Sequence, residues 1–166
     1  MLSMKQNDYL RFSNNLLSNV IYSKDLTDYT RPKEMIDPNK VQSIISVPYF
    51  SCWLIGFIEA EGCFSIYKAS NHLSNIRSFD IAQKGANNVI TAIKIYLNLT
   101  QKVIIDKRDR SKLKVSSVRS IENVINFIQK APLTLQGHKK LQYLLWLKEL
   151  RQTPRYSNKF KVPQKY

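Results

Sequence analysis

Hydrophobic residues recur every three or four positions in four stretches of the chain, and this spacing predicts amphipathic helices. The first helix should begin near Pro48, which suits a first helical turn, and end at Gly62, which suits a left-handed C-terminal cap. Another should begin at the capping residue Ser120 and end before Pro132, which cannot continue a helix. The expected helices cover residues 48–62, 86–99, 120–130 and 136–152.

Apolar and polar residues alternate in four other stretches, as expected for β-strands with one buried face. Leu113 and Val115, for example, point one way, while the lysines at 112 and 114 point the other. Two tight connections, around residues 71–75 and 109–111, would join the strands in pairs as hairpins. The expected strands cover residues 63–69, 76–84, 101–109 and 112–118.

The order of these elements predicts an α+β fold, in which hairpins form one antiparallel sheet and the helices cover one of its faces. Residues 1–46 are polar and rich in Asn and Ser, and we interpret them as an N-terminal arm or linker that is partly irregular. The folded domain should span residues 47–152, and residues 153–166 should form a basic C-terminal tail.

The net charge of +14 indicates what kind of partner the protein binds. Residues 1–50 hold six Lys and Arg against five Asp and Glu, whereas residues 51–166 hold twenty against seven. A surface of this charge binds a phosphate backbone by releasing counterions, so nucleic acid is favoured over an anionic membrane or a purely solubilising role. The polar face of the sheet would suit a groove of double-stranded nucleic acid, and an ordinary solvated face is the alternative.

Cysteine and histidine content argues against metal-knuckle and disulfide scaffolds. Cys52 and Cys63 are too few for a disulfide framework, and they form no familiar zinc spacing with His72 and His138. No run of about 18 apolar residues occurs, so we expect no membrane span.

Small residues form a stripe along one side of the first expected helix, and a carboxylate lies in its last turn. Cys52, Gly56 and Ala60 lie four residues apart, which would let another helix approach closely. Because the pattern occurs once in the chain, we expect these residues at a two-fold dimer interface, the alternative being a helix of the same domain. Two Glu61 carboxylates would then meet, and Mg²⁺ would relieve their repulsion. A solvated surface charge is the alternative, and it suits Glu59 better.

These residues resemble the signature of the LAGLIDADG homing endonucleases and the related intron maturases. Residues 54–62, LIGFIEAEG, match the nine-residue signature, with Glu at both acidic positions. The resemblance continues in order over about residues 48–152, through FDIAQK and PLTLQGHKKLQYLLWLKEL. It implies a LAGLIDADG-type αββαββα fold whose concave antiparallel sheet lies in the DNA major groove.

The resemblance also implies roles for single residues. Glu61 would ligate the metal, and Ala60 would offer its backbone carbonyl nearby. Gln83 would help to hold the attacking water, although strand alternation turns it to the apolar face, so this role needs a twist or bulge. Lys139 would stabilise the phosphate, with Lys140 as the alternative. Expected nucleic-acid contacts, from the sheet face and the resemblance, are Ser65, Tyr67, Lys68, Arg77, Lys84, Lys107, Arg108, Lys112, Lys114 and Lys140.

The implied function is sequence-specific hydrolysis of double-stranded DNA with a divalent metal. The alternative is a non-cleaving nucleic-acid-binding protein, such as an intron-RNA splicing maturase or an RNA-associated structural component. With one signature the chain would act as a homodimer, although its polar lead-in also resembles the second half of a two-signature protein that pairs with a separate first half. Genes of this family usually lie in organellar introns, so the resemblance implies a mitochondrial location.

Overall fold

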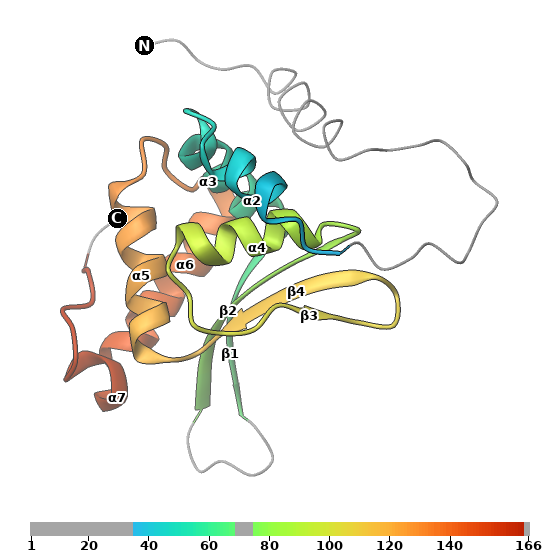
Figure 1. Ribbon diagram of the computed structural model, residues 1–166. Helices are drawn as coiled ribbons and strands as arrows, with labels where there is room; N and C mark the ends of the chain where they lie inside the picture. The colour runs from blue at the N-terminus through green and yellow to red at the C-terminus, as the bar shows by residue number, and fades with distance from the viewer. Residues whose placement is uncertain (1–34, 69–74, 165–166) are drawn as a thin grey trace.

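The computed structural model describes residues 35–68 and 75–164, and it alternates helices with two antiparallel strand pairs (Figure 1). The helices are α2 (Pro38–Ile45), α3 (Phe50–Glu61), α4 (Asn87–Tyr96), α5 (Val118–Lys130), α6 (Gly137–Arg151) and α7 (Pro154–Ser157). The strands are β1 (Gly62–Lys68), β2 (Asn75–Lys84), β3 (Ile104–Ile105) and β4 (Arg110–Val115). The expected α+β fold is confirmed.

The four strands form one antiparallel sheet in the order β1-β2-β4-β3. The register places Phe79 on β2 between Phe64 on β1 and Val115 on β4, and all three side chains are buried. Because side chains alternate between the faces of a strand, these residues define the inner face, which packs against the helices. The opposite face, called here the outer face, carries most of the polar positions of the three longer strands.

The core lies between the inner face and the helices. The ring of Phe64 occupies its centre, with ring centroids 5.3 Å from Phe79 and 5.1 Å from both Tyr143 and Trp146 of α6. Aromatic contacts of this kind add to the stabilisation that burial of apolar area provides. The sheet and α6 are therefore joined by a shared aromatic cluster rather than by isolated contacts.

The expected end of the first helix is correct in position and wrong in its physical reason. Gly62 has φ −72° and ψ 146°, which is extended backbone and not a left-handed cap. Its glycine is required by space, because a Cβ at this position would lie 2.6 Å from the carbonyl oxygen of Ile58. The chain thus passes from α3 into β1 without a linker, and Glu61 is held at the junction. Pro48 precedes the helix, which begins at Phe50.

Two further local expectations are also corrected. The N-cap of α5 is Ser117, whose Oγ accepts a hydrogen bond from the backbone N–H of Ser120 at 3.4 Å, while Ser120 itself is buried in the helix. The second hairpin turns earlier than expected, because the Asp106 carboxylate accepts hydrogen bonds from the backbone N–H groups of Arg108 and Arg110. β3 therefore ends at Ile105, and it is only two residues long.

Packing continues beyond both expected domain boundaries. The backbone N–H of Asp37, just before α2, donates to Asn88 Oδ1 at 2.8 Å, and α2 packs against α4. After α6, Tyr156 of α7 is buried, and its hydroxyl donates to the Ser116 carbonyl at 2.9 Å. Residues 1–34, most of the expected arm, lie outside the described residues, as does the first hairpin turn before Asn75, so the division into arm, domain and tail stays a prediction.

In the described part of the chain, no single helix is long and apolar enough to cross a membrane. The pair α2 and α3 passes that test jointly, and the chain bends by 100° between them. α3 directs Phe50, Leu54 and Ile58 into the core of the domain.

Candidate active site and nucleic-acid interface

The small-residue stripe of α3 faces outward. Cys52 and Gly56 are half-buried and Ala60 is exposed, so the described elements do not fully cover this side of the helix. The stripe is flanked by Trp53 and Phe57, half-buried side chains whose rings stack with centroids 4.8 Å apart. Small residues beside apolar rings form a surface that a second helix can approach closely.

The C-terminus of α3 and the N-terminus of α6 are joined by two hydrogen bonds, each of which uses a side chain of one helix and the backbone at the end of the other. Glu59 Oε2 of α3 accepts a hydrogen bond from the backbone N–H of Gln136, the N-cap of α6, at 3.2 Å. In return, Lys139 Nζ of α6 donates to the main-chain carbonyl of Gly62. A carboxylate at a helix N-terminus and an ammonium at a helix C-terminus both complement the helix dipole. Glu59 thus caps the N-terminus of α6.

Glu61 differs from Glu59 in having a free, exposed carboxylate. No residue in the described ranges makes a hydrogen bond or ion pair with it, and it lies at the negative end of α3, where the dipole disfavours an anion. Lys139 reaches the neighbouring residue Gly62, so a positive charge lies close to this acid. A carboxylate that makes no hydrogen bond, next to a lysine, is a suitable place for a cation and a phosphate to bind together.

The donor atoms at this helix end fit half of a site for a hard divalent ion. The carbonyl of Ala60 belongs to the last turn of α3, where carbonyls have no following helical N–H to accept from. Among the described residues, no group of three or more His, Cys, Asp or Glu side chains could hold a metal. One carboxylate and a carbonyl suit Mg²⁺, which is commonly bound by one or two carboxylates with water and phosphate oxygens.

β2 reaches Gln83 without the bulge that we expected. β2 remains regular to its end, and Gln83 pairs with Ser111 of β4 on the inner face. Gly62 pairs with Ile81, so Gln83 lies two residues beyond that pair, toward the point where α3 ends. Gln83 is half-buried on the helix side of the sheet, and its role beside the metal stays a prediction.

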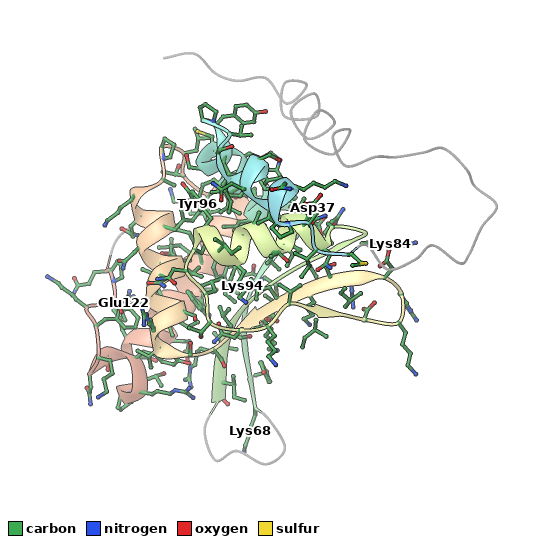
Figure 2. The ribbon with its side chains drawn as sticks, in the orientation of Figure 1. Asp37, Lys68, Lys84, Lys94, Tyr96 and Glu122 are labelled. Carbon is green, nitrogen blue, oxygen red and sulfur yellow. The ribbon has the colours of Figure 1, made fainter. Side chains whose placement is uncertain are left out.

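Most of the expected nucleic-acid contacts lie on or around the outer face. Lys68 and Lys84 mark opposite ends of the β1–β2 hairpin and are exposed (Figure 2). Lys107 and Arg108 are exposed at the tip of the β3–β4 hairpin, and Lys140 is half-buried in the first turn of α6. The remaining outer-face positions, by register, are Ser65, Tyr67, Lys112 and Lys114.

The tip of the second hairpin is held by Asp106. Backbone hydrogen bonding from Arg110, then from Arg108, together with the Arg110 guanidinium at 3.1 Å, outweighs partial burial and lowers the pKa of the Asp106 carboxyl. Asp109 adopts a positive φ of 56°, and its carbonyl accepts from the Gly85 N–H at 2.9 Å. The exposed basic residues of the tip are thereby fixed relative to β2.

Arg77 is an expected nucleic-acid contact that the structure turns toward the helices. It lies on the same face of β2 as Phe79, toward the helices. Its side chain is only 10% exposed, and its Nη2 lies 3.1 Å from Glu149 Oε2 of α6. The expectation that Arg77 belongs to the nucleic-acid face is therefore wrong. The apolar position of Phe79, two residues along the same strand, was the signal that could have shown this.

Sequence reasoning missed an acid on the outer face, Asp80. It pairs with Cys63 of β1 and Lys114 of β4, and its Oδ1 lies 3.9 Å from Lys112 Nζ and 3.8 Å from Lys114 Nζ. The ammonium of Lys114 also lies 4.2 Å from the ring centroid of Tyr67. On the outer face, the nearly buried carboxylate of Asp80 thus lies between two lysines.

Comparison with known proteins relates this geometry to a family. One relative, "Probable intron-encoded endonuclease aI3" of Dictyostelium citrinum, is 31% identical to this chain over 99 residues, which cover 60% of this chain and 39% of that protein. A protein of the same name from Debaryomyces hansenii is 34% identical over 100 residues, covering 60% of this chain and 14% of its own length. This chain therefore spans less than half of these relatives.

A solved structure supports the same fold. The crystal structure of the LAGLIDADG homing endonuclease I-GzeII in complex with a DNA target matches 92% of this chain and 47% of that one, with a TM-score of 0.56 and 14% identity. The expected LAGLIDADG-type arrangement of helices and strands is thereby confirmed. The family model described as LAGLIDADG endonuclease matches residues 54–150, more than half of the chain. The chain belongs to the LAGLIDADG endonuclease family.

Proposed function

We propose that this chain forms half of a sequence-specific endonuclease that hydrolyses both strands of double-stranded DNA with a divalent metal ion. The observation that carries the proposal is the exposed Glu61 carboxylate at the end of α3, with Lys139 donating to the adjacent Gly62. Membership of the family and the likeness to a DNA-bound endonuclease support it.

Two copies pair through the stripe formed by Cys52, Gly56 and Ala60, or one copy pairs with a separate LAGLIDADG half. The exposure of this stripe and the presence of one signature in the chain support such pairing. Pairing brings a second carboxylate beside Glu61, which completes the half-site that one chain offers.

LAGLIDADG endonucleases use divalent metal ions, and for this chain we propose Mg²⁺, because the available donors are hard oxygens. Glu61 and the Ala60 carbonyl are the groups that would hold it. When bound, such an ion polarises phosphate oxygens and lowers the pKa of water. Gln83 orients the attacking water, and Lys139 offsets the negative charge that develops on the phosphate.

The outer face lies in the DNA groove, where its basic side chains contact phosphates and base edges. Intron RNA is a second ligand of the same surface, and a mitochondrial location stays a prediction, because the relatives are named only as intron-encoded. The basic residues that surround the face, at both hairpin ends and at the β3–β4 tip, support binding to a nucleic-acid backbone.

The test is cleavage of a supercoiled plasmid library that carries random inserts, followed by sequencing of the ends. We expect Mg²⁺-dependent cuts at a common sequence with the native protein, and none with Glu61→Gln at equal DNA affinity. The variant Glu122→Gln, which removes a carboxylate from α5, should cleave normally. Tight binding of structured RNA without cleavage of any DNA would instead support the maturase function and overturn the endonuclease.

A further inference from the structure

The Asp80 carboxylate lies at the middle strand of the outer face, where an acid opposes DNA binding. Its side chain is 14% exposed, and Ser78 Oγ donates to its Oδ2 at 3.0 Å. Its other oxygen, Oδ1, is buried and makes no hydrogen bond with any described residue. An acid held in such a position reduces the attraction of the face for phosphate, so its presence calls for a role other than affinity.

Two lysines of β4 converge on this oxygen. Lys112 Nζ and Lys114 Nζ lie 3.9 Å and 3.8 Å from Asp80 Oδ1, beyond hydrogen-bond distance but within ion-pair distance. The two lysines are two residues apart on the same strand, so they would repel each other and spread if the carboxylate were absent. Asp80 therefore determines where both ammonium groups lie.

Tyr67 of β1 restrains one of these lysines from the other side. The Lys114 ammonium lies 4.2 Å from the Tyr67 ring centroid, a cation–π distance. Partial burial lowers the pKa of Lys114, but hydrogen bonding to Tyr67 and the charge of Asp80 outweigh it and raise the pKa above its ordinary value. Three strands thus hold a single ammonium that would otherwise be a flexible surface charge.

We infer that Asp80 is a positioning residue for DNA discrimination, which holds Lys112 and Lys114 over base edges and weakens binding to phosphates of any sequence. A lysine fixed over the major groove reads guanine acceptors, whereas a lysine that swings to the backbone carries no sequence information. The inference rests on the proposed DNA-binding function. Asp80 thereby lowers the affinity for DNA of any sequence and raises the selectivity for the correct site.

The test compares Asp80→Asn, which keeps the shape and the Ser78 contact, with the native protein and with Asp80→Glu. Sites are first selected from random double-stranded DNA in EDTA, so that no cleavage occurs. Kd is then measured for the selected duplex and a scrambled duplex at several salt concentrations. Glu122→Gln on α5 is the matched control, because it removes the same charge away from the sheet (Figure 2).

For Asp80→Asn we expect tighter binding of the scrambled duplex, a salt dependence steeper by about one unit, and a ratio of the two Kd values that falls about tenfold. Asp80→Glu should restore most of the ratio, and Glu122→Gln should leave it unchanged. An unchanged ratio in Asp80→Asn, or an equal loss of both affinities with a lower Tm, overturns the inference alone. Failure of the native protein to select any duplex overturns the proposed function as well.

Discussion

Lys139 of α6 donates a hydrogen bond from Nζ to the main-chain carbonyl of Gly62, the residue that follows Glu61. The contact joins the first turn of one helix to the end of another, and Glu59 makes the return contact to Gln136. The position of the proposed catalytic acid therefore depends on α6 as much as on α3. Because α6 contributes Tyr143 and Trp146 to the aromatic core, the site is attached to the core of the domain.

Replacing Lys139 with Met should separate catalysis from binding. We expect the rate of cleavage to fall by about 10²–10³, the range seen when one stabilising donor is removed from a transition state. Single-turnover cleavage and duplex Kd, measured in parallel, should show a much smaller loss of affinity. The matched variant is Lys140→Met on the neighbouring position of α6. If Lys140→Met abolished cleavage while Lys139→Met did not, the two roles would be reversed.

The two acids of the signature should differ in their effect on stability. Glu59→Ala removes a carboxylate that accepts from the N-cap of α6, so the free energy of unfolding should fall by about 0.5–2 kcal/mol. Glu61→Ala removes an exposed anion from the negative end of α3, so stability should stay the same or rise by about 0.3–1 kcal/mol. Urea denaturation measures both values, and equal losses would contradict this division of roles.

Gly62→Ala should disturb the junction between α3 and β1. The added Cβ would lie 2.6 Å from the Ile58 carbonyl oxygen, which belongs to the backbone and cannot move aside cheaply. We expect a loss of about 1–3 kcal/mol in unfolding free energy, together with a lower cleavage rate. The neighbouring exposed residue offers a control, Cys63→Ala, which should change stability by less than about 0.5 kcal/mol. Equal stability of the two variants would rule out the clash.

Arg77 and Lys107 should behave in opposite ways, although both are basic residues near the sheet. Arg77→Met breaks the pair with Glu149, so we expect a loss of about 1–3 kcal/mol in stability and no change in the salt dependence of DNA binding. Lys107→Ala should leave stability unchanged and reduce the salt slope by about one unit. Thermal unfolding and salt titrations distinguish them, and a reduced slope for Arg77→Met would return it to the DNA face.

The helices and hairpins were predictable because periodicity is a local property. Leu113 and Val115 alternate with lysines whatever the rest of the chain does, and both are buried as expected. The position of Glu61 at a helix end was predictable for the same reason, since the helical pattern before it is local, whereas its role as a metal ligand stays a prediction. The alternation along β2 also encodes the face on which Arg77 lies, but the charge of Arg77 suggested a solvent-facing role. Its partner Glu149 lies on α6, far away in the sequence, so the pair could not be predicted locally.

The remaining features depend on contacts between distant segments. Gly62 needs its glycine because of the path that the chain takes past Ile58, and no local φ preference encodes that approach. Asp80 acquires its two lysines through the register of β2 against β4, which the sequence alone does not specify. The exchange between Glu59 and Lys139 spans two helix ends that meet only in the folded domain.

The most direct test of a metal shared by two α3 ends is anomalous diffraction from crystals grown with Mn²⁺ and a selected DNA duplex. We predict a manganese peak about 2 Å from the Glu61 carboxylate of one copy and from the corresponding acid of its partner, at the DNA backbone. A peak located elsewhere, or a Glu61 that lies far from any second α3 helix, would contradict the proposed site.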